Sequence, residues 1–128
     1  MHNTEGFAAI INGVVSAESP DVVLFGASAM GRDLAPRVAA KLGVGLATDC
    51  TGIALDGDKF VATRPVFAGK AFNKIGFTAA PAVASIRPNV LPVGEPTADA
   101  AEEAAVDAAF GDTKAKIVEI EAAASTKV

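Results

Sequence analysis

The chain has 128 residues and a formal net charge of −4, from 11 Lys and Arg against 15 Asp and Glu. This length predicts one domain with a real hydrophobic core. The acidic balance disfavours nonspecific nucleic-acid binding, which needs a basic face. No apolar run approaches the ~20 residues that span a bilayer, so we expect no membrane insertion. Cys50 is the single cysteine and can form neither an internal disulfide nor a thiol-rich metal cluster. These features favour a cytoplasmic or mitochondrial-matrix protein.

The first half of the chain predicts an alternation of helices and strands. Residues 4–16 have apolar side chains at helical spacing, with Thr4 as the expected N-cap. Residues 21–26, the run DVVLFG, predict a short parallel strand that is buried on both faces. A second helix is expected over about residues 31–42, and a second short strand over residues 45–49.

Pro36 decides where the second helix can begin. With Asp33 as the N-cap, Pro36 falls in the first turn, where its missing N–H costs nothing. An earlier start would place Pro36 in the interior of the helix and should kink it. In either case Gly43 is a natural residue to end the helix, and the expected buried stripe consists of Leu34, Val38 and Leu42.

Several close strands, without a helix between them, are expected next. Residues 52–55 and 59–64 flank Asp56-Gly57-Asp58, which is typical of a hairpin turn. Strand character continues over residues 66–77 with glycine interruptions, and residues 82–87 predict a further strand. We therefore expect an α/β fold, in which a partial doubly wound, Rossmann-like sheet (or nucleotide-hydrolase-like sheet) carries an appended antiparallel β section.

The last third of the chain has weaker patterns. Residues 94–101 are rich in Gly, Glu, Pro and Ala and predict a linker. A short helix from Asp99 to Phe110 and a strand over residues 114–121 are expected after it. We accordingly divide the chain into a partial N-terminal α/β domain, residues 1–93, and a remainder of the same domain, residues 94–128.

The loop between the first strand and the second helix is a candidate anion site. It runs from Gly26 to Gly31 and is followed by Arg32. Free N–H groups and the dipole at a helix N-terminus favour negative charge, so Gly31 and Arg32 could hold an anion there. The loop lacks the Lys-Ser/Thr of a phosphate-binding loop and is not a GxGxxG sequence. The interpretation we favour is a tight structural turn.

Other polar residues at expected strand ends are interpreted mainly as structural. Cys50 has no partner base, because the one histidine lies at position 2, so a catalytic cysteine is disfavoured. Arg64 and Arg87 each precede a proline, which places them where strands end or bend. Either arginine could bind a carboxylate or phosphate in bidentate fashion, or could form a structural ion pair with Asp49, Asp56 or Asp58. No self-contained active site and no metal-ligand spacing are found.

Residues 21–91 resemble the second half of the N-terminal domain of electron transfer flavoprotein alpha subunits. The resemblance rests on four segments in order: GRDLAPRVAAKL at 31–42, the Thr48-Asp49 strand end, RPVFAGKA at 64–71, and Ile86-Arg87-Pro88. Members of this family carry further residues before this region and a second domain after it, which binds FAD with help from a beta subunit. The resemblance therefore implies a fragment or a truncated chain.

The same resemblance implies a function for the parent protein. It would be an electron carrier, not an enzyme, that passes electrons from acyl-CoA-type dehydrogenases to the respiratory chain as a heterodimer with the beta subunit. FAD would belong to the parent complex, and no FAD contact carries over to a residue of this chain. This chain would act as a scaffold and a docking surface. Structural or interface roles are expected for Asp49, Arg64, Gly69 and Arg87, with Arg64, Gly69 and Arg87 shaping the antiparallel section.

A different class of function stays open at this point. The chain could be a free-standing module that binds an adenine nucleotide, with the loop of residues 26–32 around the phosphates.

Overall fold

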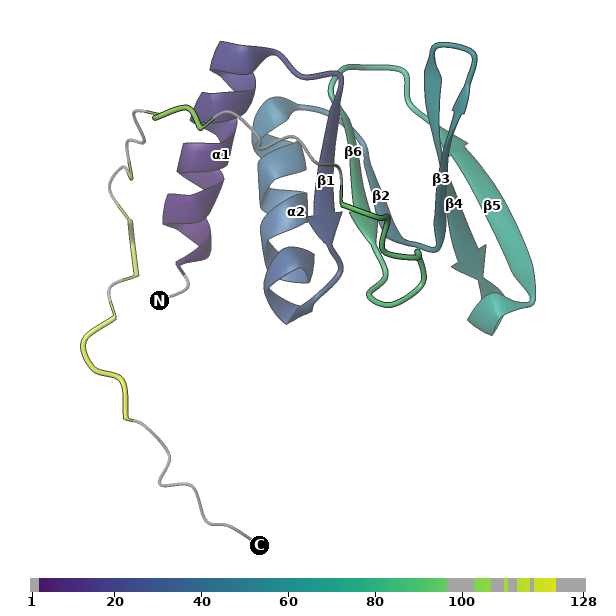
Figure 1. Ribbon diagram of the computed structural model, residues 1–128. Coiled ribbons are helices and arrows are strands. Elements are labelled where there is room, and N and C mark those ends of the chain that lie inside the picture. The colour runs from purple at the N-terminus through teal and green to yellow at the C-terminus, as the bar shows by residue number, and fades with distance from the viewer. Residues whose placement is uncertain (1–2, 97–102, 107–109, 111–112, 116, 122–128) are drawn as a thin grey trace, which may run out of the picture.

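The computed structural model describes residues 3–96, 103–106, 110, 113–115 and 117–121 (Figure 1). One helix covers one face of a parallel sheet and a second helix packs against the first, while an antiparallel sheet lies on the other side of the parallel sheet (Figure 1). In chain order the elements are α1 (Thr4–Glu18), β1 (Val22–Gly26), α2 (Ala29–Leu42), β2 (Leu46–Cys50), β3 (Gly52–Asp56), β4 (Lys59–Val66), the 3-10 turn η1 (Phe67–Gly69), β5 (Ala71–Gly76) and β6 (Ala82–Ile86). The expected mixed α/β architecture is confirmed.

The parallel sheet has the strand order β1-β6-β2, so the last of these three strands in chain order lies in the middle. Val23 pairs with Val83 of β6, and Cys50 of β2 pairs with Ile86. We had expected residues 82–87 to join the antiparallel section, and this was wrong. Ala82 through Ser85 are all buried, because a central parallel strand is covered on both faces. The antiparallel strands serve as the crossover that a parallel pair requires.

The antiparallel sheet has the order β3-β4-β5 and begins with the predicted hairpin. Gly57 has φ +61 in the turn between β3 and β4, a conformation that favours glycine. Arg64-Pro65 lies inside β4, not at a strand end as expected, since Pro65 pairs with Phe72 of β5. Proline is tolerated here because β3 begins at Gly52, opposite Thr63, so β3 does not pair with β4 beyond that residue.

Both helices begin at caps other than the expected ones. Asn3, not Thr4, caps α1 by accepting the N–H of Gly6. Ser28 caps α2 by accepting the N–H of Gly31 at 3.2 Å, so this helix takes the earlier of the two starts considered and Asp33 is not the cap. Pro36 consequently lies inside α2, where it removes the donor to the Arg32 carbonyl. The helix ends at Gly43 as expected, with φ +70.

The core consists largely of small residues. Ala47, Cys50, Ala62 and Ala84 are buried between the two sheets, and the larger side chains Phe60, Ile75, Phe77 and Ile86 pack around them. On the helix side, α2 buries Gly31, Ala35, Val38 and Ala39. Val38 belongs to the expected stripe, whereas Leu34 and Leu42 are only half-buried. Small side chains allow the helix and the two sheets to approach closely.

The described part of the C-terminal third contains neither a helix nor a strand. Residues 99–102 and 107–109 of the expected helix lie outside the described residues, and residues 103–106 are not helical. The described residues of the expected strand at 114–121 are likewise irregular. The ring of Phe110 lies 6.1 Å from that of Phe7, edge to face, and the backbone N–H of Lys114 donates to Glu5. Part of this segment therefore packs against α1.

The close packing of α2 on β1 predicts a specific sensitivity. A Cβ at Gly31 would overlap the carbonyl oxygen of Gly26, which is backbone and cannot turn aside. We expect Gly31→Ala to lower the free energy of unfolding by about 1–3 kcal/mol in urea titrations. Gly13→Ala is the matched control, because its site in α1 is open, and should raise stability by about 0.5–1 kcal/mol. Equal effects of the two substitutions would contradict the packing.

Candidate functional site at the carboxyl edge of the parallel sheet

Asp49 occupies an irregular position near the end of β2. Its φ is +54, and the pairing of β2 with β6 shifts register between Ala47 and Cys50. The Asp49 N–H donates to Ser85 Oγ at 2.9 Å instead of entering the regular ladder. Such a bulge re-aims the side chain. The carboxylate reaches the carboxyl edge of the sheet, where open α/β folds place functional groups.

Two arginines converge on this carboxylate. Arg87, directly after β6, donates from Nε to Oδ1 at 3.2 Å and from Nη2 to Oδ2 at 2.6 Å. Arg32, in the first turn of α2, places Nη2 at 3.5 Å from Oδ1. Asp49, Arg32, Arg87 and Ser85 are called the Asp49 cluster below. The bidentate Arg87 contact is the strong one, and Arg32 adds a looser ion pair.

The arginines set the charge state of Asp49. The Arg87 guanidinium lowers the pKa of the Asp49 carboxyl through its hydrogen bonds and its charge, against the opposing effect of burial, and Arg32 and Arg64 act in the same direction. In return Asp49 raises the pKa of Arg87. A carboxyl held in its charged form in this way is a poor general acid or base near neutral pH.

The candidate anion loop is closed by its own contacts. The Gly31 N–H is taken by Ser28 Oγ, and the Arg32 N–H is taken by the Ser28 carbonyl. Arg32 Nε donates to the Ala27 carbonyl at 3.0 Å, in addition to its pairing with Asp49. Gly31 also lies against the Gly26 backbone, with the Gly26 carbonyl oxygen where a Cβ would be. These contacts favour the structural turn over the anion site.

The other predicted residues are not brought into one reactive group. Arg64 is exposed in β4 opposite Asn73, and Gly69 has φ +85 in η1. Arg87 belongs to the parallel sheet and not to the antiparallel section, which corrects our expectation. Cys50 is completely buried, and burial raises the pKa of its thiol. Within the described ranges, no three metal-ligating side chains lie close enough together to hold an ion.

The Asp49 cluster joins three elements at one point. It connects the end of β2, the residue after β6 and the start of α2. Asp49, Asp56 and Asp58 were considered as ion-pair partners for Arg87, and Arg87 pairs with Asp49. Sequence reasoning missed Ser28 and Ser85. Ser85 could have been found as the one polar residue in the buried run AVASI, since a buried hydroxyl needs a hydrogen-bond partner.

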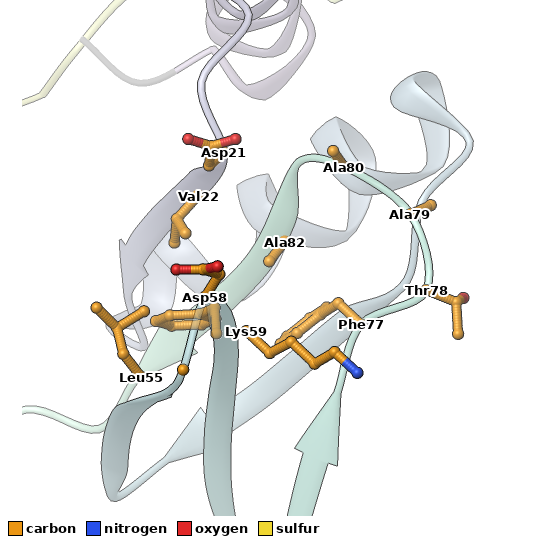
Figure 2. Close-up of a pocket in the computed structure, with 12 residues that line it drawn as sticks. Asp21, Val22, Leu55, Asp58, Lys59, Phe77, Thr78, Ala79, Ala80 and Ala82 are labelled. Atoms are coloured by element: carbon orange, nitrogen blue, oxygen red, sulfur yellow. The ribbon is translucent and has the colours of Figure 1, made fainter.

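A groove of roughly 730 Å³ lies at the opposite edge of the parallel sheet. It is lined by the β3–β4 turn and the beginnings of β1 and β6 (Figure 2). Asp21 and Asp58 stand at one end, and the Lys59 ammonium points toward the other (Figure 2). Its lining includes Phe60 and Phe77, which also pack at the core. None of the residues singled out from the sequence as site candidates lines it.

Comparisons with known proteins show which family the chain belongs to. The model of the electron transfer flavoprotein domain matches residues 1–125. The chain therefore belongs to the electron transfer flavoprotein domain family.

Named relatives specify which subunit the chain is similar to. It is 35% identical to the electron transfer flavoprotein subunit alpha of Bacillus subtilis over 93% of this chain and 37% of the relative. The same subunit of Clostridium acetobutylicum is 34% identical over 92% of this chain and 38% of the relative. Protein FixB of Azorhizobium caulinodans is 38% identical over 73% of this chain and 26% of the relative. The chain thus spans well under half the length of these relatives. In the described part, no helix is long and apolar enough to cross a membrane.

The depressed pKa of Asp49 predicts how stability depends on pH. A carboxylate contributes stability that is fully present above its ordinary pKa of 3.8 and is lost as the pH falls through the lower folded-state pKa. We expect wild type to be more stable than Asp49→Asn at pH 7, and to lose that advantage only below about pH 4. Urea unfolding of both proteins between pH 2 and 7 measures the difference. A difference that does not change with pH would contradict a charge-based contribution.

Burial of Cys50 predicts slow thiol chemistry. The side chain is fully enclosed and its thiolate is disfavoured, so a thiol reagent such as dithionitrobenzoate should react only when the protein opens. We expect reaction at least ~100-fold slower than in 6 M guanidinium. Equal rates in the two solvents would contradict the core position.

Proposed function

We propose that the chain is part of the alpha subunit of an electron transfer flavoprotein and acts as a scaffold that docks the beta subunit. The parent complex would carry electrons from acyl-CoA-type dehydrogenases to the respiratory chain, in the cytoplasm of a bacterium or in the mitochondrial matrix. The observation that carries the proposal is the similarity to a named alpha subunit over 93% of the chain.

The geometry of the Asp49 cluster supports a scaffold role over catalysis. Both arginines are paired with the Asp49 carboxylate, and each contact joins two elements of the fold. A reactive centre would instead need a titratable group with a pKa near the working pH and access to a substrate. Cys50 is buried, and Asp49 is held ionised. We accordingly propose that this chain is not an enzyme by itself.

The residues described do not fit a site that holds FAD alone. A dinucleotide in an α/β domain usually places its pyrophosphate against free N–H groups at the first helix after a strand. In this chain Ser28 occupies the Gly31 N–H, and Gly31 is packed against the Gly26 carbonyl. We propose that FAD, where the complex carries it, is held by other parts of that complex. A free-standing module that binds an adenine nucleotide with residues 26–32 is likewise not supported, because the Gly31 N–H is already bonded to Ser28.

The proposal predicts two binding results for the purified chain. It should bind the beta subunit from the same organism when the two are co-expressed, and should not retain FAD alone. Size exclusion with absorbance at 280 and ~450 nm, where flavins absorb, measures both. Stoichiometric flavin on the isolated chain would overturn the scaffold assignment. Failure to form a complex with the beta subunit would overturn the docking role.

A further inference from the structure

The turn after β4 holds an aromatic side chain in solvent with a strained backbone. Phe67, Ala68 and Gly69 have φ of +51, +53 and +85 in succession. Glycine adopts this region freely, but a phenylalanine and an alanine do so at a cost of about 1 kcal/mol or more each. The side chain gains no burial in exchange, because Phe67 is 79% exposed. Strain of this kind is typical of positions that serve recognition.

A second aromatic side chain lies at the same end of the antiparallel sheet. Ala62 and Ile75 are opposite each other and face the core, so the alternation of side chains places Phe72 and Lys74 on the outer face. Phe72 pairs with Pro65, one step before the β4–β5 pairing ends at η1. It is 63% exposed. Large exposed apolar side chains that gather in one place mark interaction sites.

The charges around these rings have one sign. Between positions 66 and 74 the chain carries Lys70 and Lys74 and no acidic residue, although the whole chain has a net charge of −4. Lys70 and Lys74 are exposed. We call Phe67, Lys70, Phe72 and Lys74 the Phe67 patch.

We propose that the Phe67 patch is a docking surface for a protein partner that presents an apolar pocket bordered by Asp and Glu side chains. Exposed aromatic residues that enter such a pocket supply most of the binding energy of an interface. The lysines at the rim steer and orient the partner by charge complementarity. The inference rests on the proposed function in one respect: we identify this partner as the beta subunit.

Two other occupants fit the patch less well. A second copy of the chain, related by a two-fold axis, would bring like charges together in an isologous contact. The described C-terminal residues of this chain lie elsewhere, because Phe110 and Lys114 contact α1. In Figure 1, α1 lies on one side of the molecule and β5 on the other.

Substitution of the two rings tests the surface directly. With the co-expressed beta subunit as the probe, the double variant Phe67→Ser/Phe72→Ser should raise the Kd at least roughly tenfold, mainly through faster dissociation. Leu55→Ser is the matched control, because Leu55 is 73% exposed at the other end of the same sheet. It should leave the Kd unchanged. Thermal unfolding of each variant checks that the fold is retained, as exposed positions allow.

Charge reversal tests the chemistry of the partner. Lys70→Glu/Lys74→Glu should lower the association rate and weaken its dependence on ionic strength. Lys41→Glu, at an exposed position on α2, controls for net charge and should have a smaller effect.

Each outcome separates this inference from the proposed function. If wild type does not bind the beta subunit, the proposed function fails. If wild type binds and the Phe67→Ser/Phe72→Ser variant binds equally well, the patch is not the docking surface. Sedimentation with vesicles of phosphatidylserine and phosphatidylcholine tests a lipid surface instead. Vesicle binding that the double phenylalanine variant loses, with unchanged beta-subunit binding, would overturn the inference in favour of a membrane.

Discussion

The fold depends on how the chain leaves one sheet and enters the next at Asp49. Its left-handed backbone breaks the ladder of β2, and Cys50 then turns into the core between the sheets. Thr51 donates to the Thr63 carbonyl and so begins the antiparallel sheet. The conformation is unfavourable for a residue with a side chain. It is offset here by a bidentate ion pair to Arg87 and a hydrogen bond from the Asp49 N–H to Ser85.

Small residues and this charged contact together hold three elements close to one another at the site. Alanines and Gly31 bring α2 and both sheets close together, and that proximity places Arg32 within reach of the same carboxylate. The Asp49 carboxylate is therefore held between two arginines at the carboxyl edge of the sheet. The docking surface that we propose, the Phe67 patch, lies instead on the antiparallel sheet.

Local sequence patterns predicted local structure well. The Asp-Gly turn of the hairpin, the existence of strand β1 and the glycine that follows α2 depend on neighbouring residues only. The expected burial of β1 on both faces was wrong, because β1 lies at the edge of its sheet and Leu24 is 47% exposed. The predictions were wrong where the structure depends on contacts between segments that are far apart in the sequence. The run AVASI cannot reveal from its own residues whether its neighbours are parallel or antiparallel, and Arg87 finds Asp49 only after the sheet has formed. The sequence left two starts open for α2, because Pro36 favours a start at Asp33 whereas the hydrogen bond from the Gly31 N–H to Ser28 favours the earlier one that the structure has.

The central place of β6 has a consequence for the order of folding. This strand is the last of the parallel sheet to be synthesised, and both of its neighbours are joined to it by long stretches of chain. The β3–β4–β5 meander needs only local contacts and can form early, whereas β1 and β2 have no partner until β6 enters between them. Loop-closure entropy makes such non-local insertion slow. We therefore expect the parallel sheet to be completed late, after the meander has brought the end of β2 close to the beginning of β6.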